Sequence, residues 1–261
     1  MSRTARAFLV LLLSAGPCAA GAGDLRVLAA VRNGDADVLR TLVRQRADVN
    51  ATEADGTSAL HLAAERDDVV IARLLVGAGA RAGAANRFGA TPLALAAVNG
   101  SARMLVLLLE AGADPEATLP GGETVLMTAA RTGRVDALDV LLARGANVNA
   151  REGARGQTAL MWAAAEGNAA AVTRLLKAGA DLRARAHGPD AEPGTKRKRI
   201  DALTPLLFAV RSGRLDAVAA LLDGGADVNE TAPDGSSALS VACLNQHWEL
   251  GALLLARGAD P

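Results

Sequence analysis

Short runs of apolar and small residues alternate with polar, glycine-containing stretches, and this pattern repeats along the chain. Each unit starts with a hydroxyl residue that precedes a run such as residues 59–64 (ALHLAA). The hydroxyl residues are Ser58, Thr91, Thr124, Thr158, Thr204 and Ser237, with steps of 33, 33, 34, 46 and 33 residues. The glycines that close the units show the same steps, at Gly79, Gly112, Gly145, Gly179, Gly225 and Gly258. A nearly fixed period of this length predicts a repeat protein whose units stack on one another.

Each unit predicts two helices. The hydroxyl residue fits the N-cap of a first helix, where its oxygen accepts a free backbone N–H. Pro92 and Pro205 follow directly, at the first helical position, where a missing N–H has no cost. The closing glycine fits the C-terminal cap of a second helix, where the backbone takes a positive φ. Apolar residues recur at helical spacing in the second run of each unit, as in Val135, Leu138, Leu141 and Leu142.

Several motifs resemble those of the ankyrin-repeat family: Thr-Pro-Leu at 91–93 and 204–206, Leu-His-Leu-Ala-Ala at 60–64 and Gly-Ala-Asp-Val-Asn at 225–229. The resemblance covers nearly everything after residue 24. It implies an all-α repeat fold in residues 23–261, an ankyrin solenoid of about seven helix-turn-helix repeats with β-hairpin fingers. The tetratricopeptide period is close, but the Trp-Leu-Gly-Tyr spacing of that family is missing. We expect repeats near 24–54, 55–87, 88–120, 121–154, 155–200, 201–233 and 234–261.

Both ends of this predicted domain depart from the pattern. The first repeat lacks the Thr-Pro-Leu signal and has Arg46 where the others have glycine, which suits an N-terminal cap. The last repeat is incomplete and lacks a polar cap, although solenoids need capped ends. We therefore expect that the natural product continues past Pro261 or that a partner covers this end.

The step of 46 residues indicates an insertion at 184–202, within the fifth repeat. Its Pro, Gly and charged residues predict an extended, mobile loop. Residues 196–199 (KRKR) form the sharpest charge cluster of the chain. We interpret this cluster as a solvated loop tip, with an acidic protein partner as the main rival and nuclear targeting or nucleic acid as further alternatives.

The first residues have the order of a secretory signal peptide. Arg3 and Arg6 precede an apolar segment at 7–15, and small residues follow it. We expect a signal peptide at 1–22, cut near Ala20 or Ala22, and a periplasmic or secreted protein that does not contact the membrane after cleavage. An ordinary apolar helix is the alternative, and Pro17 disfavours a lipoprotein acylated at Cys18. Cleavage would leave Cys243 as the one cysteine, so no internal disulfide is expected.

Composition and charge narrow the function. Hydrophobic residues make up 51% of the chain but aromatic residues only 2%, which suits thin repeated helical layers rather than one large core. Lys plus Arg and Asp plus Glu both number 28, so no clustered positive field indicates nucleic acid or an anionic membrane as the partner.

The candidate chemistry is sparse. His61, His187 and His247 have no further His or Cys at ligand spacing, which argues against a zinc site. No catalytic or phosphate-binding motif is present, so we predict no enzyme activity and no cofactor. His61 matches the family's Thr-Pro-Leu-His position, and the resemblance implies that its imidazole bridges backbone groups of neighbouring fingers. Trp248 is expected in the core, whereas Trp162 fits core packing and a binding hot spot equally well.

What the resemblance implies about function is binding of another protein on the concave face of the stack. The variable positions flank the finger glycine and the end of the first helix. The candidate partner-binding residues are Asp55, Glu65, Arg66, Arg87, Asn99, Glu123, Arg131, Arg155, Gln157, Trp162, Glu166, Arg211, Asp234 and Asn245. We expect a monomeric, non-catalytic scaffold whose partner the sequence does not identify. The alternative is the targeting half of a larger exported protein whose catalytic domain lies beyond residue 261.

Overall fold

The computed structural model describes residues 25–186 and 202–261. Over these residues fourteen α-helices follow one another in seven pairs, which confirms the predicted all-α solenoid and its seven repeats. The helices are α1 (Arg26–Arg32), α2 (Ala36–Arg44), α3 (Ala59–Glu65), α4 (Val69–Gly77), α5 (Pro92–Asn99), α6 (Ala102–Glu110), α7 (Val125–Thr132), α8 (Val135–Ala143), α9 (Ala159–Glu166), α10 (Ala169–Lys177), α11 (Pro205–Arg211), α12 (Leu215–Asp223), α13 (Ala238–Leu244) and α14 (Trp248–Ala256).

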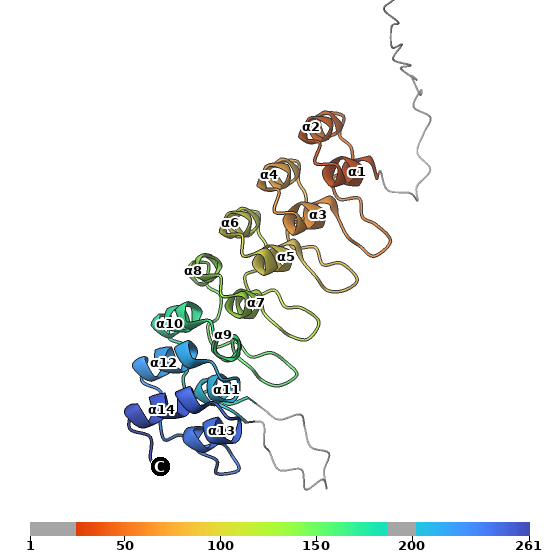
Figure 1. The fold of residues 1–261 in the computed structure, drawn as a ribbon. Helices are drawn as coiled ribbons and strands as arrows, with labels where there is room; N and C mark the ends of the chain where they lie inside the picture. Colours follow the sequence, from red (N-terminus) through yellow and green to blue (C-terminus); the bar gives the residue numbers. More distant parts are fainter. Residues whose placement is uncertain (1–24, 187–201) are drawn as a thin grey trace, which may run out of the picture.

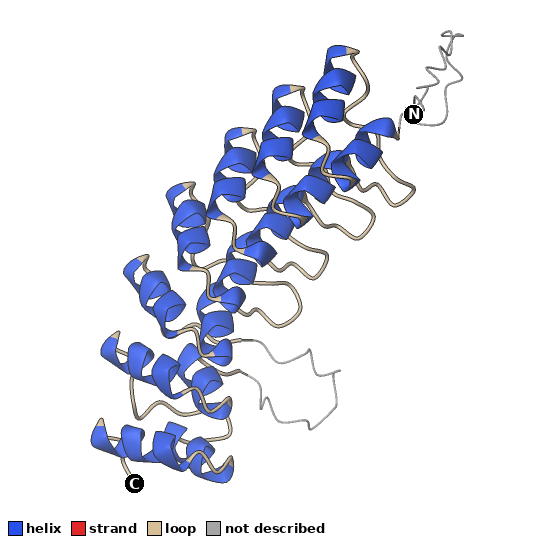
Figure 2. Cartoon of the chain, turned by 45° about the horizontal axis from the view of Figure 1, so that its top comes forward, coloured by secondary structure: helices blue, strands red, loops and turns tan. Residues whose placement is uncertain are grey.

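The helices form two parallel rows (Figures 1 and 2). Odd-numbered helices, the first of each repeat, make one row, and even-numbered helices make the other. Each first helix packs against its own partner and against the first helix of the next repeat. The loops between repeats, here called fingers, project from the odd-numbered row, and the stack curves toward them. We call the surface made by the fingers and the odd-numbered helices the concave face.

The repeating hydroxyl residues lie at the N-caps of the first helices, as predicted. In five of the six, the side-chain oxygen accepts the backbone N–H three residues later, as Thr124 does from Met127 at 3.2 Å. Thr158 is the exception, because its buried hydroxyl has no hydrogen-bond partner. The capping position was therefore correct at Thr158, but the predicted capping bond was wrong.

Positive-φ residues end most of the helices. The six closing glycines all have a positive φ, for example 88° at Gly79 and 96° at Gly225. Arg46, which occupies the same position in the first repeat, keeps this conformation with a φ of 58°. Asp67 and Gln246 likewise have φ values of 55° and 62° where other first helices are followed by glycine. Three non-glycine residues thus hold a left-handed conformation that costs an L-residue about 1–2 kcal/mol.

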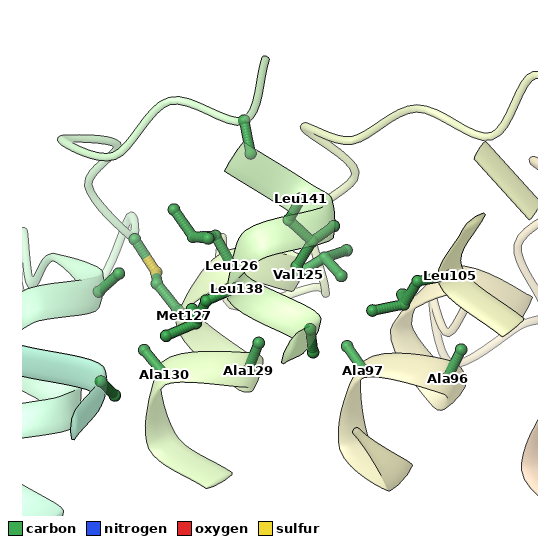
Figure 3. Close-up of a cluster of buried hydrophobic side chains, with 14 of the residues drawn as sticks. Ala96, Ala97, Leu105, Val125, Leu126, Met127, Ala129, Ala130, Leu138 and Leu141 are labelled. Atoms are coloured by element: carbon green, nitrogen blue, oxygen red, sulfur yellow. The ribbon is translucent and has the colours of Figure 1, made fainter. Parts of the chain in front are cut away.

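The core runs continuously from repeat to repeat. Figure 3 shows the alanine pairs of two successive first helices, Ala96–Ala97 and Ala129–Ala130, with Leu105 and Leu138 from the second helices beside them. All of these side chains are fully buried. Because an alanine carries a single methyl group, neighbouring first helices can approach closely, and the leucines of the second helices fill the space behind them.

The fingers are simpler than the expected β-hairpins. Within the described residues the structure contains isolated antiparallel bridges, Thr52–Ser58, Thr118–Thr124 and Thr231–Ser237, and no regular strand. A short turn closes each of these fingers. In the first, the Glu53 N–H donates to the Thr57 carbonyl at 2.9 Å. A turn this tight leaves room for a single bridge rather than a ladder.

Several predicted features lie outside the described residues: the signal peptide at 1–22, His187 and the basic cluster at 196–199. The two ends of the insertion are described. The Ala186 N–H donates to the Leu203 carbonyl at 3.1 Å, which joins these ends. The Arg185 guanidinium donates to the Ala202 and Thr231 carbonyls at 3.1 and 3.2 Å. The insertion therefore starts and finishes at one point of the stack.

Trp248 does not lie in the core. It is the first residue of α14, and 67% of its surface is exposed. The equivalent residue of α12, Leu215, is also exposed, whereas Ala36 of α2 and Val69 of α4 are partly buried against the core at the same position. Within residues 25–186 and 202–261, none of the helices combines the length and apolarity that crossing a bilayer requires.

Candidate partner-binding face

All fourteen candidate residues lie on the concave face, and none of them is buried. Eight come from the first helices or the residue that follows them: Glu65, Arg66, Asn99, Arg131, Trp162, Glu166, Arg211 and Asn245. The other six come from the fingers: Asp55, Arg87, Glu123, Arg155, Gln157 and Asp234. The periodicity therefore placed these residues on one surface, although their contacts differ.

Two of the candidates hold the stack together. The Arg66 guanidinium donates to the Arg32 carbonyl at 2.6 Å. The Asn99 amide donates to the Ala64 and Glu65 carbonyls at 3.0 and 2.8 Å. In each case the acceptors end the first helix of the preceding repeat, where carbonyls lack partners within the helix. Arg66 and Asn99 thus have a structural role in addition to their exposure.

In later repeats a different residue donates to the carbonyls that end the first helix of the preceding repeat. The donors are the side chains of Asn168, Arg214 and His247, which lie at the N-caps of α10, α12 and α14. Asn168 donates to the Arg131 carbonyl at 2.8 Å, and Arg214 donates to the Ala165 carbonyl at 3.0 Å. These bonds fix the ends of the first helices, and with them the side chains that those ends carry on the concave face.

The finger residue Asp55 shapes its own turn. Its Oδ1 accepts the Thr57 N–H at 2.9 Å, and its carbonyl accepts the Arg87 N–H of the next finger at 2.7 Å. The hydrogen bonds from Thr57 lower the pKa of the Asp55 carboxyl below its ordinary value. Asp55 therefore remains ionised at neutral pH and links two adjacent fingers.

Three candidates, Glu123, Arg131 and Trp162, meet at the boundary between the fourth and fifth repeats. The Arg131 guanidinium lies 5.6 Å from the centre of the Trp162 ring. One of its terminal nitrogens is 3.7 Å from Glu123 Oε1, which also accepts the Thr128 hydroxyl at 2.8 Å. Arg131 Nε and Trp162 Nε1 are buried and have no hydrogen-bond partner among the described residues. The site thus combines a cation, an aromatic ring and two N–H groups that the fold does not satisfy.

Sequence reasoning missed two aromatic residues of this face. Phe88 is 61% exposed and lies under the Arg87 guanidinium at 5.3 Å. Phe208 is a buried core residue whose ring lies 5.1 Å under the Arg211 guanidinium. Phe88 directly precedes Gly89 just as Asp55 directly precedes Gly56, so a strict alignment of the repeats would have included it. The exposed apolar surface of the concave face also includes Val98 and Leu244, which are 50% and 78% exposed.

His61 has the backbone contacts that the family resemblance implied. Its Nδ1 faces the Ser58 N–H at 3.2 Å and the Ser58 hydroxyl at 2.8 Å, so the proton lies on Nε2, which donates to the Ala90 carbonyl at 3.0 Å. Burial lowers the pKa of the imidazole below its ordinary value. Both ring nitrogens are used inside the protein, and His61 is almost fully buried. The imidazole therefore links two repeats and does not face a substrate.

Elsewhere in the part of the chain that the structure describes, no group of three or more His, Cys, Asp or Glu side chains is arranged to hold a metal ion. The single cysteine of these residues, Cys243, is exposed.

Comparisons with known proteins agree with this geometry. A family model described as ankyrin repeats (3 copies) matches residues 27–119, 117–186 and 187–261. Among solved structures, the chain is similar to the human ASB11 ankyrin repeat domain, with a TM-score of 0.71 and 28% sequence identity. That similarity covers 90% of this chain and 98% of the human one. A search of curated proteins returned no match.

Proposed function

The chain belongs to the ankyrin-repeat family, and from this premise we propose that it is a non-catalytic scaffold that binds another protein on its concave face. Ankyrin repeats generally mediate protein–protein interaction. The observation that carries the proposal is the division of roles within each repeat. Core positions, such as the paired alanines, are buried, whereas the candidate residues of the concave face remain accessible to solvent.

Several of these accessible positions carry side chains that a protein partner could contact. Phe88 and Val98 expose apolar surface, and Glu65 and Glu166 are exposed carboxylates. Aromatic and arginine side chains are enriched among the residues that dominate binding energy in protein interfaces, and charged residues at the edge guide association. This mixture of signs and apolar groups supports a protein partner rather than a polyanion.

Affinity capture with the purified chain tests the proposal. In the test variant Glu65→Lys, Phe88→Ser, Val98→Ser and Glu166→Lys change the concave face at exposed positions. The matched control, Val38→Ser with Val70→Ser, changes residues of the second helices that are 46% and 59% exposed. We expect a protein that is captured by the wild type and the control but lost from the test variant. Equal capture by both variants would contradict the proposal.

We also propose that the protein is exported, with a periplasmic or secreted destination. The support is the order of basic, apolar and small residues in segment 1–22. Mass spectrometry of the protein recovered from its native compartment tests this, because export predicts a chain that starts after Ala20 or Ala22. An intact N-terminus in that protein would rule the proposal out.

A further inference from the structure

Arginine side chains of this molecule form ion pairs, hydrogen bonds to backbone carbonyls or contacts with aromatic rings. In the second helices or directly after them, Arg144, Arg174 and Arg257 each form an ion pair with a carboxylate of the preceding repeat. The distances are 3.1 Å from Arg144 to Glu110 and 2.8 Å from Arg257 to Asp223. These arginines link successive repeats, and a neighbouring carboxylate already neutralises their charge.

On the concave face, three arginines lie on aromatic rings. The three such pairs of the described residues are Arg87 with Phe88, Arg131 with Trp162 and Arg211 with Phe208. Among the described residues no ion pair neutralises Arg211, and Arg131 reaches Glu123 only at 3.7 Å, while that carboxylate is bonded to Thr128. A guanidinium that lies over a ring is held in place, and its N–H edge remains able to bind a carboxylate in two parallel hydrogen bonds.

The residues of two of these pairs have equivalent positions in the repeat, although Arg131 contacts a ring of the next repeat and Arg211 a ring of its own helix. Arg131 and Arg211 each follow the capping hydroxyl of their helix by seven residues, and Trp162 and Phe208 each follow it by four. In the fifth repeat, which lies between these two, Ala165 occupies the position of the arginine. Since α7, α9 and α11 pack side by side, the order along the concave face is cation, apolar gap, cation. We call Arg131, Trp162, Ala165, Phe208 and Arg211 the arginine–aromatic row, in which the buried Phe208 ring supports Arg211 from the core side.

The charges around this row favour an anionic ligand. Arg155 and Arg214 are exposed in the same repeats, and neither forms an ion pair among the described residues. Three glutamates of the same repeats are already engaged: Glu123 with Thr128, Glu230 with Thr204, and the buried Glu152 with backbone N–H groups. Glu166 is exposed next to Ala165. Among these groups the exposed arginines, Arg155, Arg211 and Arg214, therefore outnumber the exposed glutamate, Glu166, although the whole chain is neutral.

We propose that the arginine–aromatic row docks an acidic peptide segment of the partner protein. One carboxylate binds Arg131, a second binds Arg211, and an apolar side chain between them lies over Ala165 and the Trp162 ring. This proposal rests on the scaffold function described above and specifies the chemistry of the partner. Arginine is suited to the role because its planar fork matches a carboxylate, which the lysine ammonium does not.

The test uses the full chain with Trp248→Phe, so that Trp162 is the one tryptophan and its fluorescence reports on the row. The probes are peptides with two glutamates separated by a varied number of leucines. Each has a matched control peptide, its glutamine twin, in which both glutamates are replaced by glutamine. We expect at least one glutamate peptide to change the Trp162 emission, with an affinity that falls as salt is added. Its glutamine twin should bind about tenfold or more weakly, because charge-assisted hydrogen bonds are roughly twice as strong as neutral ones.

Substitutions locate the binding. Arg131→Gln and Arg211→Gln should each weaken the glutamate peptide about tenfold, equivalent to about 1.4 kcal/mol. The matched control is Arg144→Gln, which removes a paired arginine of the second-helix row and should leave the affinity unchanged. Urea unfolding of each variant shows whether the fold is retained, and Arg131→Lys, which keeps the charge, should lose more affinity than the control.

Any of three results would overturn the proposal: no glutamate peptide binds, the glutamine twins bind equally well, or Arg144→Gln weakens binding as much as Arg211→Gln. Equally tight binding of single-stranded RNA would also overturn it, in favour of a general anion surface. If the peptides fail while the concave-face variant still loses a captured protein, the scaffold function stands and only the acidic ligand is wrong.

Discussion

The His61 Nε2 lies 3.0 Å from the Ala90 carbonyl oxygen, so one buried imidazole joins the second repeat to the finger that opens the third. Among the hydroxyl-capped first helices, His61 alone carries an imidazole at the third helical position; the others have Ala94, Met127, Met161, Leu207 and Ser240. The strength of the junction between these two repeats consequently depends on a buried titratable ring.

We predict that stability falls in mild acid because of His61. Burial lowers the folded-state pKa below the ordinary 6.5, so the unfolded chain binds the proton more readily. The contribution is therefore complete above about pH 6.5 and is lost as the pH falls through the folded-state pKa. Urea unfolding of the wild type and of His61→Ala across this range measures the effect. The variant should lose about 1–3 kcal/mol at neutral pH and less in acid. A difference that does not vary with pH would contradict this assignment.

Glu230 should give stability the opposite pH dependence to that of His61. It stands where earlier repeats have Ala51, Ala84, Ala117, Ala150 and Ala184, and its carboxyl forms a hydrogen bond with the Thr204 hydroxyl. Burial raises the pKa of Glu230 above its ordinary 4.5. Because the folded state holds the proton more tightly, this contribution to stability is present below pH 4.5 and is lost as the pH rises through the folded-state pKa.

Glu230→Gln should therefore raise the unfolding midpoint at neutral pH and leave it unchanged in acid. The matched control is Glu152→Gln. The Glu152 carboxylate is buried and accepts the N–H groups of Ala154, Arg155 and Gln157, so the loss of its charge should destabilise the protein by about 1–3 kcal/mol. A fall in the midpoint of Glu230→Gln at neutral pH would show that the interaction with Thr204 outweighs the cost of burial.

Arg46→Gly should stabilise the first repeat. Arg46 has a φ of 58°, a conformation that glycine adopts without the steric cost of a Cβ atom. We expect a gain of about 0.5–1 kcal/mol after the greater entropy of glycine in the unfolded chain is subtracted. Gly112→Ala is the reciprocal control, since a Cβ there would touch no other atom and only the φ of 87° is unfavourable. It should lose about 1 kcal/mol. Thermal unfolding measures both variants.

Thr158→Val should be neutral or stabilising, whereas Thr124→Val should cost about 1 kcal/mol. Both residues are N-caps of first helices, but only the Thr124 hydroxyl accepts a backbone N–H. The Thr158 hydroxyl is buried without a partner, and a methyl group of similar size removes this unsatisfied group. Equal losses from the two substitutions would show that the Thr158 hydroxyl does form a capping bond in solution.

The sequence was sufficient to predict the repeats, their number and the positions of the first-helix caps, because these features follow from local chemistry. A hydroxyl at an N-cap or a glycine at positive φ is required by the backbone at that position, and the same requirement recurs in every unit. Trp248 shows where the pattern is insufficient. Its spacing fits an apolar face, but its place at the start of α14 turns the ring toward solvent.

The candidate site was predicted as a surface but not as a set of contacts. Arg131 contacts a tryptophan 31 positions further along the chain, and which side chains meet across a repeat boundary depends on rotamers. The same limit applies to Arg66 and Asn99. Their exposure follows from their positions in the repeat, but their hydrogen bonds to the preceding repeat cannot be predicted from those positions.

The bond between Ala186 and Leu203 also makes the molecule amenable to engineering. Because α9 packs against α11 and α10 against α12 across this junction, we expect the stack to accept a different sequence between Ala186 and Leu203, provided that its ends can come together. The entropy of closing a longer segment rises by only about 0.6 kcal/mol for each doubling of its length. A reporter, an epitope or an entire folded cargo could be grafted at this junction, with the scaffold on both sides left unaltered.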